Sequence, residues 1–126
     1  MPQLLAIQVP WRGQADLVPA LAALVELNVV FIRMYRCPLL YSSGVRYQRE
    51  GKKADGSYFE RWLTAPEVIR YGHGDCEDLA SYRAAELRIA GDSRAIAIPV
   101  PSSIGWHIVT RHGDGTIEDP SRKLGM

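Results

Sequence analysis

The sequence predicts a single α+β domain, spanning residues 1–126, in which helices pack on a small antiparallel sheet. Segments with apolar residues at helical spacing come first along the chain, and three short strand-like segments follow them. The last two strands are separated by His112-Gly113-Asp114-Gly115, a composition typical of hairpin turns. Because helices and strands are segregated along the chain, we expect an α+β fold.

The first helix is expected from Asp16 to about Arg36. Asp16 can cap its N-terminus, and Pro19 falls within the first turn, where proline is tolerated. Its other faces are also largely apolar, so we expect it to be the central buried helix, and Pro38 to stop it. A stripe of residues at helical spacing supports this assignment: Leu17, Leu21, Leu24, Val25, Asn28, Ile32 and Tyr35.

Two further helices are expected before the strands. Thr64 can cap a short helix over residues 65–71, with Pro66 as an early helical residue. Asp75 is the expected N-cap of the next helix, and Asp78 matches the acidic member of a capping box. Gly91 is expected to stop that helix. Residues 2–12 are interpreted as an edge strand or arm, and the polar part of 38–60 as a surface loop.

The three strands are expected at 94–100, 106–111 and 116–119. A three-residue turn between the last two would place Val109 opposite Asp119, with His107 as the diagonal neighbour on the same face. A carboxylate could then reach the imidazole ring. A four-residue turn would instead point His107 and Asp119 to opposite faces, so the pairing of these two residues depends on the register.

Composition excludes several classes of protein. Fifteen basic and fourteen acidic residues give a formal charge of +1, so nothing predicts binding to nucleic acid or to an anionic membrane. The most apolar segment, residues 17–32, is expected to be too short and too interrupted to span a bilayer. Cys37 and Cys76 make neither a disulfide framework nor a metal cluster. Without a secretory signal in the sequence, a cytoplasmic location is expected.

Cys76 is the candidate nucleophile. It follows a glycine-marked turn and is expected to be about the first residue of a helix. There the helix dipole and a nearby imidazolium would lower the pKa of the thiol, and the backbone N–H of Cys76 could bind a developing oxyanion. The alternative is that Cys76 is a small buried apolar residue, as most free cysteines are. Cys37 has none of these features and is expected to be structural.

His107 is the preferred candidate base among three histidines. It lies on an expected strand between Trp106 and Ile108, whereas His112 falls in the hairpin turn. His73 lies close to Cys76 in sequence, on a Gly-His-Gly segment. Asp119 would fix the tautomer of His107 and stabilise its imidazolium form. The composition of Asp119-Pro120-Ser121 also suits a simple turn.

Three acidic residues surround the candidate nucleophile: Asp75, Glu77 and Asp78. The simpler interpretation is that they complement the helix dipole. The alternative is that their oxygen atoms bind calcium, although three carboxylates without further ligands are few for that ion. We therefore expect no metal and no cofactor at this site, with calcium as the alternative.

The order of these motifs resembles the core of the transglutaminase-like (papain-like thiol) superfamily. The resemblance is carried by GDCEDLA around Cys76, GWHIV around His107 and DPS at Asp119, in that order, and covers the chain from about Gly72 to Met126. GDCED is also similar to bacterial transglutaminase-like cysteine proteinases, some of which bind calcium. The compact form resembles small phage or prophage transglutaminase-like proteins.

The resemblance implies a Cys76-His107-Asp119 triad in a helix-and-sheet core of that family. The family's second oxyanion donor is a side chain upstream of the nucleophile, and no Gln or Trp motif matches here. Tyr41, Tyr47 and Trp62 are candidates, and Tyr41 is preferred for its place beside the turn at Gly44.

These observations predict a hydrolase, either a cysteine protease or an amidase, that cleaves an amide or peptide bond of a protein or peptide through a thioester. Transamidation is the variant in which an amine replaces water, and a small-molecule acyltransferase would use the same triad. The alternative is a non-catalytic scaffold or morphogenesis protein that keeps the fold for binding. Phage origin would place the protein in a host cytoplasm or a virion.

Overall fold

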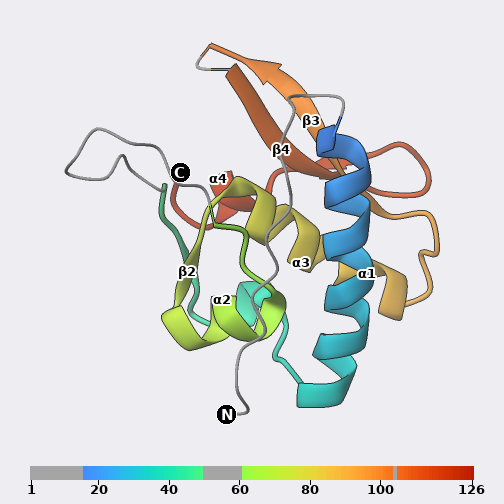
Figure 1. Ribbon diagram of the computed structural model, residues 1–126, viewed down its shortest axis with the longest axis vertical. Helices are drawn as coiled ribbons and strands as arrows, with labels where there is room; N and C mark the ends of the chain where they lie inside the picture. Colours follow the sequence, from blue (N-terminus) through green and yellow to red (C-terminus); the bar gives the residue numbers. More distant parts are fainter. Residues whose placement is uncertain (1–15, 50–60, 104) are drawn as a thin grey trace.

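The structure is a computed structural model that describes residues 16–49, 61–103 and 105–126. The interpretation of residues 2–12 and most of the predicted surface loop lie outside these ranges. Figure 1 shows the arrangement of the elements. Their bounds are α1 (Leu17–Tyr35), a 3-10 turn (Leu40–Ser42), β1 (Arg46–Tyr47), α2 (Ala65–Tyr71), β2 (His73–Gly74), α3 (Cys76–Ile89), β3 (Ile96–Ser102), β4 (Gly105–Arg111), β5 (Ile117–Glu118) and α4 (Pro120–Lys123).

The mixed α+β class predicted from the sequence is confirmed. The three C-terminal strands form one antiparallel sheet in the order β3-β4-β5. A second, two-stranded parallel sheet joins β1 to β2 and was not predicted, because each of its strands is only two residues long. This small sheet brings the segment that contains Tyr47 beside the residues that precede Cys76, since Tyr47 pairs with Gly74.

The central helix is α3, and the expectation that the first helix would be central is wrong. α3 contacts α1, β3 and β4. Its interior residues are fully buried, among them Leu79, Ala80, Tyr82, Ala84 and Ala85. The alanines allow neighbouring elements to approach closely, so a helix of modest hydropathy occupies the centre of the core.

α1 runs along one side of the molecule (Figure 1) and buries only one face. Its buried residues are Leu17, Leu21, Leu24, Val25, Asn28 and Ile32, which are members of the stripe predicted from the sequence. The helix has 19 residues, and its length and apolar composition would allow it to cross a membrane. By length and composition, the expectation that this segment is too short and too interrupted to span a bilayer is therefore wrong.

The helix starts follow the predicted capping chemistry at α2 and α3. Thr64 and Glu67 form a capping box at α2, with Pro66 in the first turn. Asp75 and Asp78 form the corresponding box at α3. At α1, Asp16 occupies the N-cap position without a side-chain cap hydrogen bond, which differs from the expectation. The α3 box fixes the backbone on both sides of Cys76.

Candidate active site

The hairpin between β4 and β5 has the register on which the pairing of His107 and Asp119 depended. Thr110 pairs with Glu118, and the backbone N–H of His112 donates to the Thr116 carbonyl at 2.8 Å, which leaves three residues in the turn. His107 and Asp119 therefore lie diagonally on one face. His107 Nε2 is 2.9 Å from Asp119 Oδ2.

This hydrogen bond determines the tautomer of His107. A carboxylate can only accept, so Nε2 carries the hydrogen and donates it to Asp119. In the neutral ring, Nδ1 then holds a lone pair and is the basic nitrogen. The side chains of His107 and Asp119 are 15% and 20% exposed, so water screens the pair only partly. Asp119 has a second role, because it is also the N-cap of α4 and accepts from the backbone N–H of Arg122.

Cys76 is the first residue of α3, as the sequence predicted. Its thiol is partly buried, and the backbone N–H of Ile108 on β4 interacts with the sulfur. Ile108 directly follows His107 in the chain. The start of α3 and the histidine-bearing stretch of β4 therefore meet at the thiol, and the fold brings all three segments that carry Cys76, His107 and Asp119 to one region.

The charge state of the thiol differs from the expectation. Burial, and then the neighbouring Glu77 carboxylate, raise the pKa of Cys76 well above its ordinary value, and Asp75 adds to the rise. The Ile108 N–H lowers this pKa but does not offset the other influences. The thiol donates to Glu77 Oε2 at 3.4 Å. In this structure the resting group is a neutral thiol, because burial and the carboxylates of Glu77 and Asp75 oppose the thiolate that the helix start was expected to favour.

The backbone N–H of Cys76 is not available to an oxyanion in this arrangement, which corrects a second expectation. It donates to Asp75 Oδ1 at 2.7 Å. Asp75 is 7% exposed and also takes part in the capping box with Asp78. A substrate oxyanion could receive this N–H only after the Asp75 carboxylate releases it.

Tyr41, the preferred candidate for the second oxyanion donor, is engaged elsewhere. Its hydroxyl donates to Glu118, and burial together with that carboxylate raises the pKa of Tyr41 well above its ordinary range. The cations of Arg83 and Lys123 lie over its ring. With its one hydroxyl hydrogen bound to Glu118, Tyr41 has none to offer an oxyanion, and the structure does not support its assignment.

Tyr47 lies closer to the chemistry than Tyr41. Burial, the charges of Asp75 and Cys76, and a side-chain hydrogen bond with Asp75 together raise the pKa of Tyr47 to about 12. Tyr47 was one of the three candidates from the sequence. What places it at the thiol is the pairing of β1 with β2, which no short-range pattern in the chain predicts.

The other two histidines have partners outside this region of the thiol. His73 stacks on Tyr71, with ring centroids 6.1 Å apart. His112 lies 2.9 Å from Glu118 through Nε2. His107 is therefore the candidate base, because Asp119 holds its ring and it lies on the strand whose Ile108 N–H interacts with the Cys76 sulfur.

A metal ion would find its ligands in a different set from the predicted one. Asp75, Cys76 and Glu77 each offer an atom within 4.8 Å of the others. Asp78 belonged to the predicted calcium set, but its Oδ1 accepts from the Leu63 N–H at 2.7 Å and its Oδ2 from the Asp75 N–H at 2.9 Å. A thiol with two carboxylates is not the all-oxygen donor set that calcium prefers.

The site combines a sulfur atom at a helix start with a histidine oriented by a carboxylate, which are the groups that nucleophilic chemistry needs. The acidic side chains of Glu77 and Asp75 oppose ionisation of the thiol, so the sulfur must lose its proton before it can act as a nucleophile.

Comparison of the chain with protein-family models, with curated proteins and with solved structures finds no significant match.

Proposed function

We propose that this protein is a cysteine-dependent acyl-transfer enzyme that cleaves an amide or peptide bond through a thioester. The observation that carries the proposal is the hydrogen bond of 2.9 Å between His107 and Asp119. Ile108, which follows His107 on β4, contacts the Cys76 sulfur through its backbone N–H. We include in this proposal a transglutaminase-like arrangement of the core. Its support is the order of the three motifs around Cys76, His107 and Asp119.

In the proposed mechanism His107 Nδ1 takes the proton of Cys76 as the sulfur attacks the substrate carbonyl carbon. Asp119 holds Nε2–H and stabilises the imidazolium that forms. The tetrahedral intermediate collapses with cleavage of the C–N bond, and the proton moves from Nδ1 to the leaving amine. Water, activated by the same nitrogen, then cleaves the thioester to a carboxylic acid and restores the thiol. An amine in place of water would give transamidation.

The raised pKa of Cys76 makes the proton transfer part of the attack itself. A free thiolate would form rarely in the resting protein, because it would lie beside the carboxylates of Glu77 and Asp75. If His107 removes the proton while the sulfur–carbon bond forms, no free thiolate of Cys76 has to exist beside these carboxylates.

The same observations favour a second candidate function, a non-catalytic scaffold or binding protein that retains this fold. A neutral thiol and an engaged Cys76 N–H are what a structural cysteine would show. Under this alternative the His107–Asp119 pair stabilises the hairpin and nothing more.

Acylation of the cysteines by an activated ester distinguishes the two functions. The protein is mixed with p-nitrophenyl acetate, and acetylation of Cys76 and Cys37 is followed by mass spectrometry of peptides. The enzyme proposal predicts rapid acetylation of Cys76, lost in His107→Ala. The control is His112→Ala, which removes a histidine bonded to Glu118 and should leave the reaction intact. Equal, slow acetylation of both cysteines would support the binding function.

A further inference from the structure

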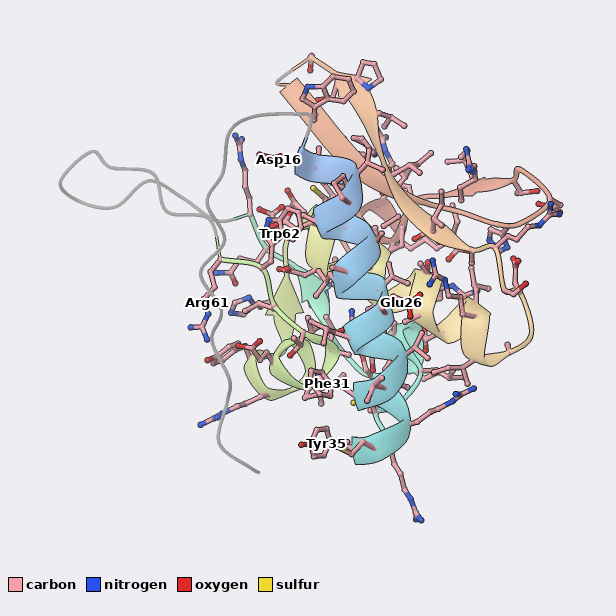
Figure 2. The ribbon with its side chains drawn as sticks, turned by 45° about the vertical axis from the view of Figure 1, so that its right-hand side comes forward. Asp16, Glu26, Phe31, Tyr35, Arg61 and Trp62 are labelled. Carbon is pink, nitrogen blue, oxygen red and sulfur yellow. The ribbon has the colours of Figure 1, made fainter. Side chains whose placement is uncertain are left out.

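The outward face of α1 is apolar, although this helix lies at the surface of the described part of the chain. Leu27, Val30 and Met34 are 40%, 51% and 60% exposed. In Figure 2 α1 runs vertically along the front of the molecule, below the upper ends of the strands. Water-exposed apolar rows of this kind mark interaction sites in soluble domains.

The spacing of these residues is that of a helix–helix seam. Ala20, Ala23, Leu27, Val30 and Met34 follow one another at alternating intervals of three and four residues. We call these five residues the outer seam of α1. Intervals of three and four keep a stripe facing one partner helix, as the a and d positions of a coiled coil do. The buried residues of α1 lie on the opposite side and pack in the core of this same chain.

Two charges flank the outer seam on the same side: Glu26 and Arg33. They lie one position before Leu27 and Met34, so both occupy the same flanking position of the repeat. If a second α1 packs antiparallel about a two-fold axis, Leu27 meets the second copy's Val30 and Ala23 meets its Met34. The small Ala23 then faces the large Met34. Glu26 and Arg33 of the other copy then flank the seam on the same side, two residues out of level, a stagger that their long side chains can span, and the two-fold axis repeats this pair.

We propose that the outer seam of α1 is a homodimer interface, occupied by the antiparallel α1 of a second copy of this chain. The charge complementarity favours the antiparallel arrangement. In a parallel pair Glu26 would face apolar positions of the other helix, such as Phe31, and both charges would lose their partners. A lipid surface fits less well, because interfacial helices carry many basic residues beside their apolar face. This proposal is independent of the chemistry at Cys76.

Glu26 already has one partner in its own chain, which the interface must accommodate. Its Oε1 is 2.5 Å from Arg88 Nη1 on α3, and its side chain remains 72% exposed. Glu26 points from α1 toward the end of α3 (Figure 2). A carboxylate has two oxygens, so Glu26 can bind Arg88 through one and an incoming Arg33 through the other.

Sedimentation equilibrium over a wide range of concentration tests the interface. We expect the full chain to form a dimer of twice the chain mass of 14.1 kDa, and Val30→Lys to be monomeric. Val18→Lys is the matched control, since Val18 is 55% exposed on the same helix but lies outside the outer seam. A wild-type protein that stays monomeric, or a dimer that survives Val30→Lys, overturns the proposal. Flotation with neutral phosphatidylcholine vesicles, lost only in Val30→Lys, would assign the seam to lipid instead.

Charge reversal tests the antiparallel geometry separately. Glu26→Arg and Arg33→Glu should each weaken the homodimer, because like charges then face one another at both ends. Mixing the two variants should restore dimers of one copy of each, since every flanking pair is then opposite in sign. Equal weakening without restoration in the mixture would exclude this register. Circular dichroism of each variant verifies that the helix content is unchanged.

Discussion

At the scale of single residues, Cys76 shows how local charge overrides position. The first turn of a helix favours a thiolate, through its unpaired N–H groups and its dipole. Here the N–H of Cys76 donates to Asp75, and the thiol donates to Glu77. Burial and these two carboxylates raise the pKa of the thiol, so its neighbours cancel what the helix start would provide.

Glu77→Gln is predicted to lower the pKa of Cys76. The substitution removes the larger of the two carboxylate contributions and keeps the side-chain volume, while burial still holds the pKa above its ordinary value. Alkylation by iodoacetamide, followed by mass spectrometry across a pH series, should move its midpoint to lower pH. At a fixed pH below that midpoint, the alkylation rate should rise about tenfold for each pH unit by which the midpoint falls. Cys37 in the same molecule is the internal reference, and an unmoved Cys76 midpoint would refute the assigned cause.

The residues of the candidate site were predictable to different degrees. The pairing of His107 with Asp119 was expected for a three-residue turn and not for a four-residue turn, and the structure has the three-residue turn. The contact of Glu77 with the thiol was not predicted, because adjacent residues of a helix usually point apart and only the side-chain rotamer decides. The sequence offered Tyr47 as one of three candidate oxyanion donors without a reason to prefer it. In the structure, the pairing of β1 with β2 places Tyr47 in a hydrogen bond with Asp75.

At the scale of elements, a buried polar contact joins α1 to α2. Asn28 is fully buried, and its Oδ1 accepts from the backbone N–H of Ala65 at 2.8 Å. That N–H belongs to the first turn of α2 and has no acceptor within its own helix. The sequence placed Asn28 in an apolar stripe without a reason for an amide there. The reason is that a neighbouring helix start needs an acceptor.

Asn28→Leu is predicted to destabilise the protein by about 1–3 kcal/mol, because it leaves the Ala65 N–H buried without an acceptor. The loss should lie toward the lower end, since Asn28 Nδ2 finds no hydrogen-bond acceptor among the described residues and its removal costs nothing. Urea unfolding measures the change. Ala22→Leu on the exposed side of α1 is the control and should stay within about 0.5 kcal/mol. An unchanged midpoint for Asn28→Leu would refute this role.

The elements themselves were predictable where local chemistry determines them. The α2 and α3 starts follow their capping residues, and the three C-terminal strands follow their turn residues. The choice of central helix was not predictable from hydropathy. α1 is the more apolar helix, yet α3 is central, because its small side chains let α1 and the sheet pack closely against it. The proposed interface at the outer seam accounts for the apolar residues of α1 that do not pack in the core.

At the scale of the whole molecule, Glu118 connects three parts of the chain. It accepts from the Tyr41 hydroxyl, from Arg83 Nε of α3 at 2.6 Å, and through its other oxygen lies 2.9 Å from His112 Nε2. Burial alone would raise the pKa of Glu118, but the hydrogen bonds of Arg83, Tyr41 and His112 outweigh burial and lower it to about 2. The carboxylate therefore stabilises the fold only while it is charged.

Glu118→Gln is predicted to remove part of the acid sensitivity of the fold. The pKa of Glu118 is about 2 in the folded state and about 4.5 in the unfolded chain, so the unfolded state binds the proton more readily. Its stabilising contribution is complete above about pH 4.5 and is lost as the pH falls toward 2.

In wild type the free energy of unfolding should fall over this window, and in Glu118→Gln it should fall less steeply from a lower value at neutral pH. Parallel curves for wild type and Glu118→Gln would show that the three partners hold the parts together without the charge. Since the same Glu118 adjoins Asp119, acid that protonates this network should also loosen the strand end that positions His107.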